Sequence, residues 1–312
     1  MLKRYYFCFV FCLLLASYNC FATQHSESYV KTDYDTQLFV HQMGNGADVV
    51  ILHGGPGLGF QYMYNSYKEL ANYYRVTFFD QRGSNNSSTI LDAEHINIDK
   101  LVYDLEQLRK TKGIKKMHLL GHSFGGYIAA HYAKQYPENI KSIIFVASAP
   151  LSRLEWDKLQ ANFNSAMEEA NIDVTALTTA EKFVQGDIAT HNTYYKTLFA
   201  EYMCNRKYAI NMDFGFFGNS ATRAITMQGL FGQQIFAENN NFDDYATLAN
   251  VTSPVLVIHG DCDIVPLTAS EKLKKSFPNA TLKQTTTGHF PDLEDHAGFI
   301  RIVTDFLATK QE

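Results

Sequence analysis

The sequence predicts an α/β fold, a mostly parallel sheet flanked by helices with a mainly helical cap inserted into it. From residue 48 to 147, short apolar runs of strand length alternate with helix-like segments. Such alternation is typical of βαβ units, which place parallel strands between layers of helices. The alternation then stops and resumes at Ser253-Pro254, and the segment between is helical in pattern and rich in aromatic residues. We therefore expect a core at 23–150 and 251–312 and a cap at 151–250.

The elements of the core can be placed from their hydrophobic patterns. Leu101, Leu105 and Leu108 repeat at i, i+4 and i+7, which is the spacing of one buried helix face. Before the cap, strands are expected at 48–53, 75–80, 116–121 and 140–147, and helices near 66–74, 98–112 and 124–136. After the cap, strands are expected at 254–260 and 280–286, and a helix at 297–310.

Residues 121–126 read Gly-His-Ser-Phe-Gly-Gly and lie between an expected strand and an expected helix. A turn with glycine at 121 and 125 is too tight for side chains and would lift the Ser123 hydroxyl above the sheet. The pentapeptide alone is equally typical of an ordinary glycine-rich turn. A serine hydroxyl is a poor nucleophile unless a base takes its proton and a third group orients that base. In this architecture the partners should follow in the order Ser, acid, His.

Both partners occur where strand-end loops are expected. The run ending at Gly260 is followed by Asp261 and Asp263, two carboxylates that compete for the role of the acid. The next strand-like run is followed by Thr287-Gly288-His289, so that a loop would present the His289 imidazole after a small residue. The chain therefore supplies a serine, an acid and a histidine in the required order.

His53-Gly54-Gly55-Pro56-Gly57 follows the first expected strand of the alternation. Glycines at a strand end let the backbone fold over a ligand and direct amide N–H groups at it. The negative oxygen of a tetrahedral intermediate needs such donors, and the loss of one typically costs about 2.7–4 kcal/mol of barrier. Such a run is more often only a turn. Its position upstream of Ser123 predicts an oxyanion hole made by the N–H groups of Gly55 and Phe124.

Three motifs together resemble the proline iminopeptidase branch of the α/β-hydrolase superfamily. They are His-Gly-Gly-Pro-Gly at 53–57, Asp-Gln-Arg-Gly-Ser at 80–84 and the run at 121–126, and the resemblance extends from Val30 onward. It implies the α/β-hydrolase fold with an inserted cap. It also implies an acyl-enzyme mechanism that needs no cofactor.

The resemblance also assigns roles to individual residues. Ser123 would be the nucleophile, His289 the base and Asp263 the acid, because the acid of this fold lies in a Gly-x-x-Asp run followed by an apolar pair and Pro. Asp261 would then cap or brace the turn. Three further residues at strand ends are expected to brace the oxyanion loop rather than transfer protons: His53, Asp80 and Arg82.

The substrate is open between two classes. Members of the branch carry acidic residues in the cap that bind the free α-amine of the substrate, and this cap has no clear match to that pattern. Glu201, beside an aromatic run, is the best candidate, with Glu168 and Glu169 as alternatives. We expect an aminopeptidase on short peptides; a carboxylesterase on small apolar esters is the alternative. A module that keeps the triad but only binds a ligand is the third hypothesis.

Composition and the N-terminal segment predict where the protein acts and which partners it lacks. Residues 1–22 carry Lys3 and Arg4, then an apolar run and small residues, which is typical of a secretory signal peptide and predicts a periplasmic or secreted protein. No basic cluster, metal-ligand spacing or phosphate-loop lysine is visible, so nucleic acid, a metal and stable membrane association after signal cleavage are not expected. Cys204 and Cys262 would remain, as a bridge or as two buried thiols.

Overall fold

The computed structural model describes residues 25–238 and 240–309. The expected signal peptide at 1–22 lies outside the described residues. Within the described part of the chain, no helix is both long enough and apolar enough to cross a membrane.

The described residues form one eight-stranded sheet with the order β1-β2-β4-β3-β5-β6-β7-β8. The strand β2 pairs in antiparallel fashion with β1 on one side and with β4 on the other, and all other neighbours are parallel. Every residue of β3, β5 and β7 is buried, as expected for strands covered on both faces. The strands are β1 His25–Lys31, β2 Gln37–Met43, β3 Asp48–Leu52, β4 Arg75–Phe79, β5 Met117–His122, β6 Ile140–Val146, β7 Val255–Gly260 and β8 Ala280–Thr285.

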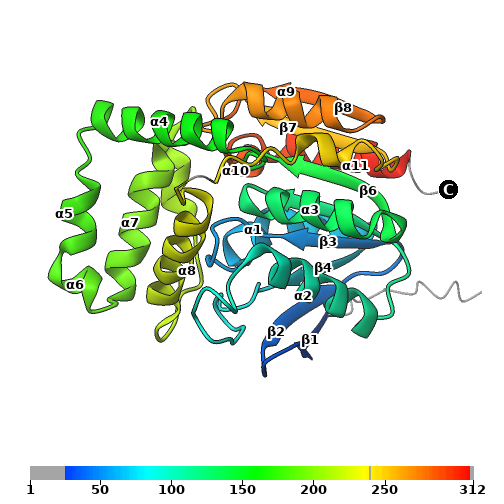
Figure 1. The fold of residues 1–312 in the computed structure, drawn as a ribbon, viewed down its shortest axis with the longest axis horizontal. Helices are drawn as coiled ribbons and strands as arrows, with labels where there is room; N and C mark the ends of the chain where they lie inside the picture. The colour runs from blue at the N-terminus through cyan, green and yellow to red at the C-terminus, as the bar shows by residue number, and fades with distance from the viewer. Residues whose placement is uncertain (1–24, 239, 310–312) are drawn as a thin grey trace, which may run out of the picture.

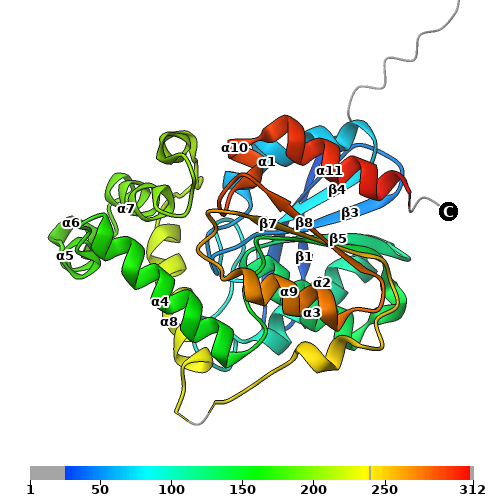
Figure 2. The same ribbon diagram turned by 90° about the horizontal axis from the view of Figure 1, so that it is seen from above.

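Helices cover both faces of the sheet (Figure 2). On one face lie α2 Ile98–Thr111, α3 Phe124–Gln135 and α9 Leu267–Ser276; on the other lie α1 Gln61–Tyr67, α10 Pro291–Glu294 and α11 His296–Ala308. Each layer buries its own apolar cluster, with Leu101, Leu105 and Leu108 in the first and Phe299 in the second. The predicted α/β fold, a mostly parallel sheet flanked by helices, is therefore confirmed.

The insertion between β6 and β7 is helical and lies to one side of the sheet (Figure 1). Its helices are α4 Arg153–Glu169, α5 Val174–Thr179, α6 Glu181–Val184, α7 Ile188–Ala200 and α8 Ser220–Ile235, with 3-10 turns at Arg206–Asn211 and Tyr245–Leu248. An isolated bridge between Ser152 and Asp243 joins its two ends. The Arg223 guanidinium of α8 donates to the carbonyl oxygens of Asn85 and Ser87, so the insertion is also attached to the loop after β4.

Three elements differ from the sequence prediction: α1, β1 and β2. The helix expected near 66–74 begins earlier, as α1, and tightens into a 3-10 turn at Lys68–Asn72. Its buried side chains Tyr62, Met63, Ser66 and Tyr67 follow a helical spacing, but polar residues between them conceal the pattern. The antiparallel strands β1 and β2 at the edge of the sheet were not predicted, because they lie before the βαβ alternation begins.

Candidate active site

Ser123 occupies a sharp turn between β5, which ends at His122, and α3, which begins at Phe124. Its backbone has φ 53° and ψ −120°, a conformation that residues with a side chain rarely adopt. Glycine is required on both sides of this turn. A Cβ at Gly121 would lie 2.6 Å from the Gly125 carbonyl oxygen, and a Cβ at Gly125 would collide with the Leu52 carbonyl oxygen. The tight strand–turn–helix expected from the sequence is present.

Asp263 and His289 form a hydrogen-bonded pair at the ends of neighbouring strands. Oδ1 of Asp263 lies 2.7 Å from Nδ1 of His289, and the side chains are 0 % and 6 % exposed. The same carboxylate oxygen accepts the Val265 N–H at 3.0 Å, which fixes its orientation. Asp261 is exposed and none of its contacts involves His289. Of the two competing carboxylates, the structure brings Asp263 to the imidazole.

Ser123 and His289 line the same cavity. In the described residues no hydrogen bond joins the Ser123 hydroxyl to the imidazole. Such bonds are often long in an enzyme without substrate and tighten in the complex. With Nδ1 of His289 bonded to Asp263, the Nε2 atom is the one left to exchange a proton with a serine or with water.

His53 holds the turn that is expected to form the oxyanion hole. The Gln81 N–H donates to Nε2 of His53 at 3.0 Å, so the proton of the ring lies on Nδ1, which donates to the Gly54 carbonyl oxygen at 2.8 Å. Burial lowers the pKa of His53 to about 4, which keeps the ring neutral. Because a peptide unit is planar, fixing the Gly54 carbonyl also fixes the N–H of Gly55, which points the opposite way. Gly55 and Phe124, the predicted donors, both line the cavity.

Asp80 and Arg82 have structural contacts, but the hydrogen-bond partners of Arg82 are Asp33, Asp104 and the His95 carbonyl oxygen rather than the turn at 53–57 that it was expected to brace. Asp80 accepts the N–H groups of Phe60 and Asn86, and burial raises the pKa of its carboxyl group to about 6. The fully buried Arg82 guanidinium contacts Asp104 through two nitrogens, at 2.7 and 2.6 Å. Neither residue lines the cavity.

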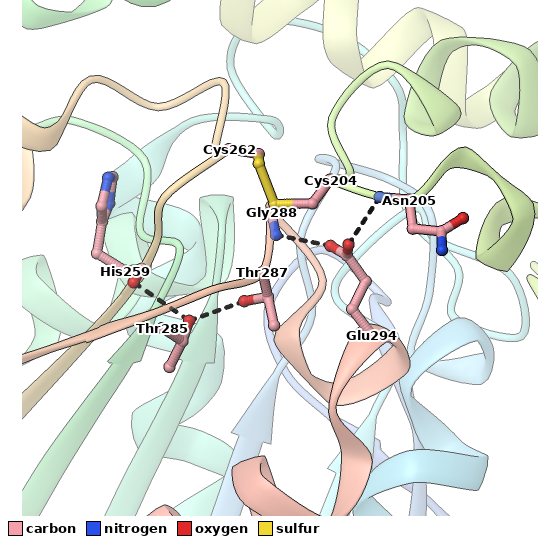
Figure 3. Close-up of a disulfide and its surroundings, with 8 residues drawn as sticks. All are labelled: Cys204, Asn205, His259, Cys262, Thr285, Thr287, Gly288 and Glu294. Atoms are coloured by element: carbon pink, nitrogen blue, oxygen red, sulfur yellow. Dashed lines mark hydrogen bonds between the residues drawn. A yellow bond between two sulfur atoms is a disulfide. The ribbon is translucent and has the colours of Figure 1, made fainter.

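A clasp joins the cap to the loops that carry Asp263 and His289 (Figure 3). We use this name for a disulfide and a carboxylate bridge. Cys204 of the cap forms a disulfide with Cys262, next to Asp263. The Glu294 carboxylate accepts the Gly288 N–H at 2.6 Å through one oxygen and the Asn205 N–H at 3.0 Å through the other.

The backbone of His289 is itself attached to the cap. Its N–H donates to the Tyr202 carbonyl oxygen at 2.7 Å. Gly288 is packed so closely here that a Cβ would lie 2.7 Å from the Cα of Met203. The position of His289 thus depends on a cap segment far away in the sequence.

The cavity beside Ser123 has a volume of ≈ 320 Å³ and is mainly aromatic. Its polar side chains besides Ser123, the histidines and the tyrosines are Gln160 and Gln228. Among the described residues that line it there is no Asp, Glu, Lys or Arg. The rings come from both the cap and the core: Tyr62, Phe124, Trp156, Phe163, Tyr194, Tyr195, Phe199, Tyr202, Phe231, Phe236 and Phe290.

The acids expected to bind an amine are not in this cavity. Glu201 follows the end of α7 and pairs with Arg206 at 2.6 Å, and it is not a lining residue. Glu168 and Glu169 lie at the exposed end of α4. Sequence position placed Glu201 beside an aromatic run, but the helix directs the neighbouring tyrosines, and not this carboxylate, to the cavity. No group of three or more described His, Cys, Asp or Glu residues is arranged to hold a metal ion.

Comparison with known proteins gives the family of the chain. Residues 49–296 match the family model described as the alpha/beta hydrolase fold. The chain belongs to the α/β-hydrolase family. A proline iminopeptidase of Clostridium botulinum is 28% identical over 276 residues, covering 85% of this chain and 90% of the relative. One from Xylella fastidiosa (strain 9a5c) is 28% identical over 289 residues, covering 82% and 88%.

Solved structures of α/β hydrolases share the fold. The crystal structure of the proline iminopeptidase of Mycobacterium smegmatis matches with a TM-score of 0.67 at 21% identity, covering 92% of this chain and 99% of the other. This likeness covers most of the sheet and of the cap, and it shows that the fold is shared. This α/β hydrolase is related to proline iminopeptidases.

Several residues around the candidate site were not found by sequence reasoning. Tyr62, His122 and Glu294 hold backbone groups of the loops around the cavity, and Trp156 lines the cavity. His122 lies inside the Gly-x-Ser-x-Gly motif, so its position was a signal. The other three come from helices whose contacts depend on how the cap and α1 pack.

Proposed function

We propose that the protein is a serine hydrolase that forms an acyl-enzyme. The observation that carries the proposal is the hydrogen-bonded Asp263–His289 pair lining one cavity with Ser123, which stands on a sharp turn. In the proposed reaction Nε2 of His289 takes the proton of Ser123 as the hydroxyl attacks a carbonyl carbon. Asp263 stabilises the resulting imidazolium and holds its orientation.

The rest of the reaction follows from the same groups. The N–H groups of Gly55 and Phe124 stabilise the oxyanion of the tetrahedral intermediate. His289 then gives its proton to the leaving group, which departs and leaves Ser123 acylated. Water, deprotonated by His289, attacks the acyl-enzyme, and the acid product is released as Ser123 recovers its proton.

We propose an ester with a small, uncharged, apolar acyl group as the substrate. The cavity supports this choice because its lining, among the described residues, is aromatic and carries no formal charge. A free α-ammonium group would lose its hydration in this cavity and would find no carboxylate there. It would therefore lack a charge-assisted hydrogen bond, which typically contributes about 1.5–3 kcal/mol.

An aminopeptidase that removes an N-terminal residue such as proline from short peptides is the second candidate. It is favoured by the similarity to proline iminopeptidases over more than four fifths of the chain. Aromatic rings attract cations by about 0.5–2 kcal/mol, so tyrosine and tryptophan rings could partly replace a carboxylate around the amine.

A fluorophosphonate probe and a matched pair of substrates test these proposals. We expect covalent labelling of the wild-type protein and none of Ser123→Ala; no labelling of folded wild-type protein would favour a ligand-binding module. We expect p-nitrophenyl butyrate to be hydrolysed and prolyl p-nitroanilide to be poor. A kcat/KM for prolyl p-nitroanilide at least tenfold above that for its N-acetyl form would instead indicate an aminopeptidase.

We also propose that the protein works in an oxidising compartment, either the periplasm or outside the cell. The disulfide between Cys204 and Cys262 supports this, since such bonds persist mainly outside the reducing cytosol. Mass determination of the protein isolated from its own cells under alkylating conditions tests it. Free thiols at both positions would contradict it.

A further inference from the structure

Tyr62 and His122 form a buried pair beside the cavity. The Tyr62 hydroxyl lies 2.7 Å from Nδ1 of His122, and the residues are 5 % and 2 % exposed. The same hydroxyl lies 2.7 Å from the Gly54 nitrogen. On the other side, Nε2 of His122 lies 2.9 Å from the His289 carbonyl oxygen. One pair of side chains therefore contacts the backbone of two separate loops.

The positions of the protons in this series of hydrogen bonds can be assigned. A carbonyl oxygen only accepts, so Nε2 of His122 carries a proton and donates it to the His289 oxygen. Burial lowers the pKa of His122 to about 3, so the ring is neutral and Nδ1 has a free lone pair. The Tyr62 hydroxyl therefore donates to Nδ1 and accepts the Gly54 N–H. Burial also raises the pKa of Tyr62, which keeps this hydroxyl protonated.

The loops joined by the pair carry three different parts of the proposed catalytic machinery. Gly54 precedes Gly55, whose N–H is a proposed oxyanion donor. His122 precedes Ser123, and the carbonyl that it holds belongs to His289 itself. The packing is close, because a Cβ at Gly54 would lie 3.0 Å from the Tyr62 hydroxyl and 2.9 Å from the Ser123 Cβ.

Gly54 is held from both sides. His53 donates to its carbonyl oxygen and Tyr62 accepts its N–H. The two peptide planes that meet at this residue are thus each fixed by one side chain, so the Gly54–Gly55 segment has little freedom to rotate.

We infer that Tyr62 and His122 are positioning residues that hold the oxyanion turn, the nucleophile and the base in one arrangement. This inference rests on the proposed serine-hydrolase function. Neither residue transfers a proton to the substrate; each acts through backbone groups of its neighbours. A displacement of about 1 Å in such an arrangement can cost roughly 100-fold in rate, so the pair should matter more for turnover than for binding.

Tyr62→Phe is the first test, with Tyr67→Phe as its matched control. Both tyrosines lie on α1 and are buried, but the Tyr67 hydroxyl has no hydrogen-bond partner in the described structure. We expect Tyr62→Phe to lower kcat for p-nitrophenyl butyrate about tenfold to 100-fold with KM changed less than about threefold. The rate of labelling by the fluorophosphonate should fall by a similar factor, and Tyr67→Phe should change neither rate.

Replacements of His122 provide a second test that does not depend on Tyr62→Phe being folded. Glutamine keeps an N–H donor that can reach the His289 carbonyl oxygen, whereas leucine fills similar space without one. We expect His122→Gln to turn over at least severalfold faster than His122→Leu, compared well below the unfolding temperature of each.

The outcomes separate this inference from the proposed function. If wild-type protein is not labelled at Ser123, the serine-hydrolase proposal fails. If wild-type protein is labelled but folded Tyr62→Phe keeps the kcat of Tyr67→Phe, the positioning role is wrong. The role is equally wrong if the two His122 variants turn over at the same rate.

Discussion

Removal of the disulfide in the clasp should destabilise the protein by an amount that its position predicts. Cys204 and Cys262 are 58 residues apart in the sequence. Closing a loop of that length in the unfolded chain reduces its entropy, which by the loop-entropy relation stabilises the fold by about 4 kcal/mol at 25 °C. Both cysteines are exposed, so serine at both positions introduces no buried hydroxyl and a reductant can reach the bond.

Urea unfolding followed by circular dichroism measures the effect. We expect Cys204→Ser/Cys262→Ser to lose about 3–4 kcal/mol in the free energy of unfolding, and wild-type protein in dithiothreitol to lose the same amount. Dithiothreitol should not change the double variant, because no bond remains for it to reduce. A loss below about 1 kcal/mol in the double variant would refute the loop-entropy reasoning. A further shift of the double variant by reductant would show that the effect lies elsewhere.

Three other perturbations follow from the site and its buried groups. Asp263→Asn should lower kcat in an ester assay roughly ten-thousandfold, because the imidazole loses the partner that fixes its tautomer. Asp261→Asn should change kcat less than about threefold, and the reverse ranking of the two variants would assign the acid role to Asp261. Glu294→Gln leaves one backbone N–H of the clasp facing an amide N–H₂ group. We therefore expect kcat to fall about tenfold while circular dichroism shows that the fold is retained. An unchanged kcat would refute a role of the clasp in placing the base. Acidification from pH 7 to 5 should lower the unfolding temperature. The reason is that histidines in the unfolded chain bind protons with a pKa of about 6.5, whereas three buried histidines stay neutral in the folded protein. A rise would mean that the opposite effect of Asp80 and Asp292, whose pKa burial raises to about 6, is larger. The histidines, with pKa held at about 4, 4 and 3, are His53, His118 and His122.

The parts of the fold that the sequence predicted are those with a local pattern. Apolar runs predicted the strands from β3 to β7, since a strand buried on both faces reads as a continuous apolar run. The strand β8 is only partly buried and was predicted from a strand-like run with polar residues. Alternating helices implied the parallel pairing. The edge strand β1 was not predicted, because most of its residues are exposed and its sequence is therefore mainly polar. The early start of α1 was not predicted because the polar residues Gln61, Asn65 and Ser66 break up the apolar run in the sequence.

The candidate site likewise has residues that a local sequence pattern predicts and residues that it does not. The turn around Ser123 and the placement of His289 depend on short motifs, so sequence reasoning could propose both residues. The choice of Asp263 over Asp261 needed the resemblance as well. Glu201 shows the limit: its neighbours in sequence suggested a place in the cavity, but its pairing with Arg206 is set by how the chain leaves α7. Contacts made by Glu294 and Tyr62 join segments far apart in the chain, and no local pattern encodes them.

The backbone conformation of Ser123 sets stability against activity at this position. Its positive φ is unfavourable for a residue with a Cβ, at a cost typically of about 1–3 kcal/mol, and the surrounding turn must hold it there. A chain selected for stability alone would carry glycine at this position. We therefore expect Ser123→Gly to unfold at a higher temperature than Ser123→Ala, although both lack the nucleophile, and an equal or lower value would show that the turn is relaxed. The residue that would do the chemistry is then also one that weakens the fold, so loss of function by Ser123→Gly would be accompanied by a gain in thermal resistance.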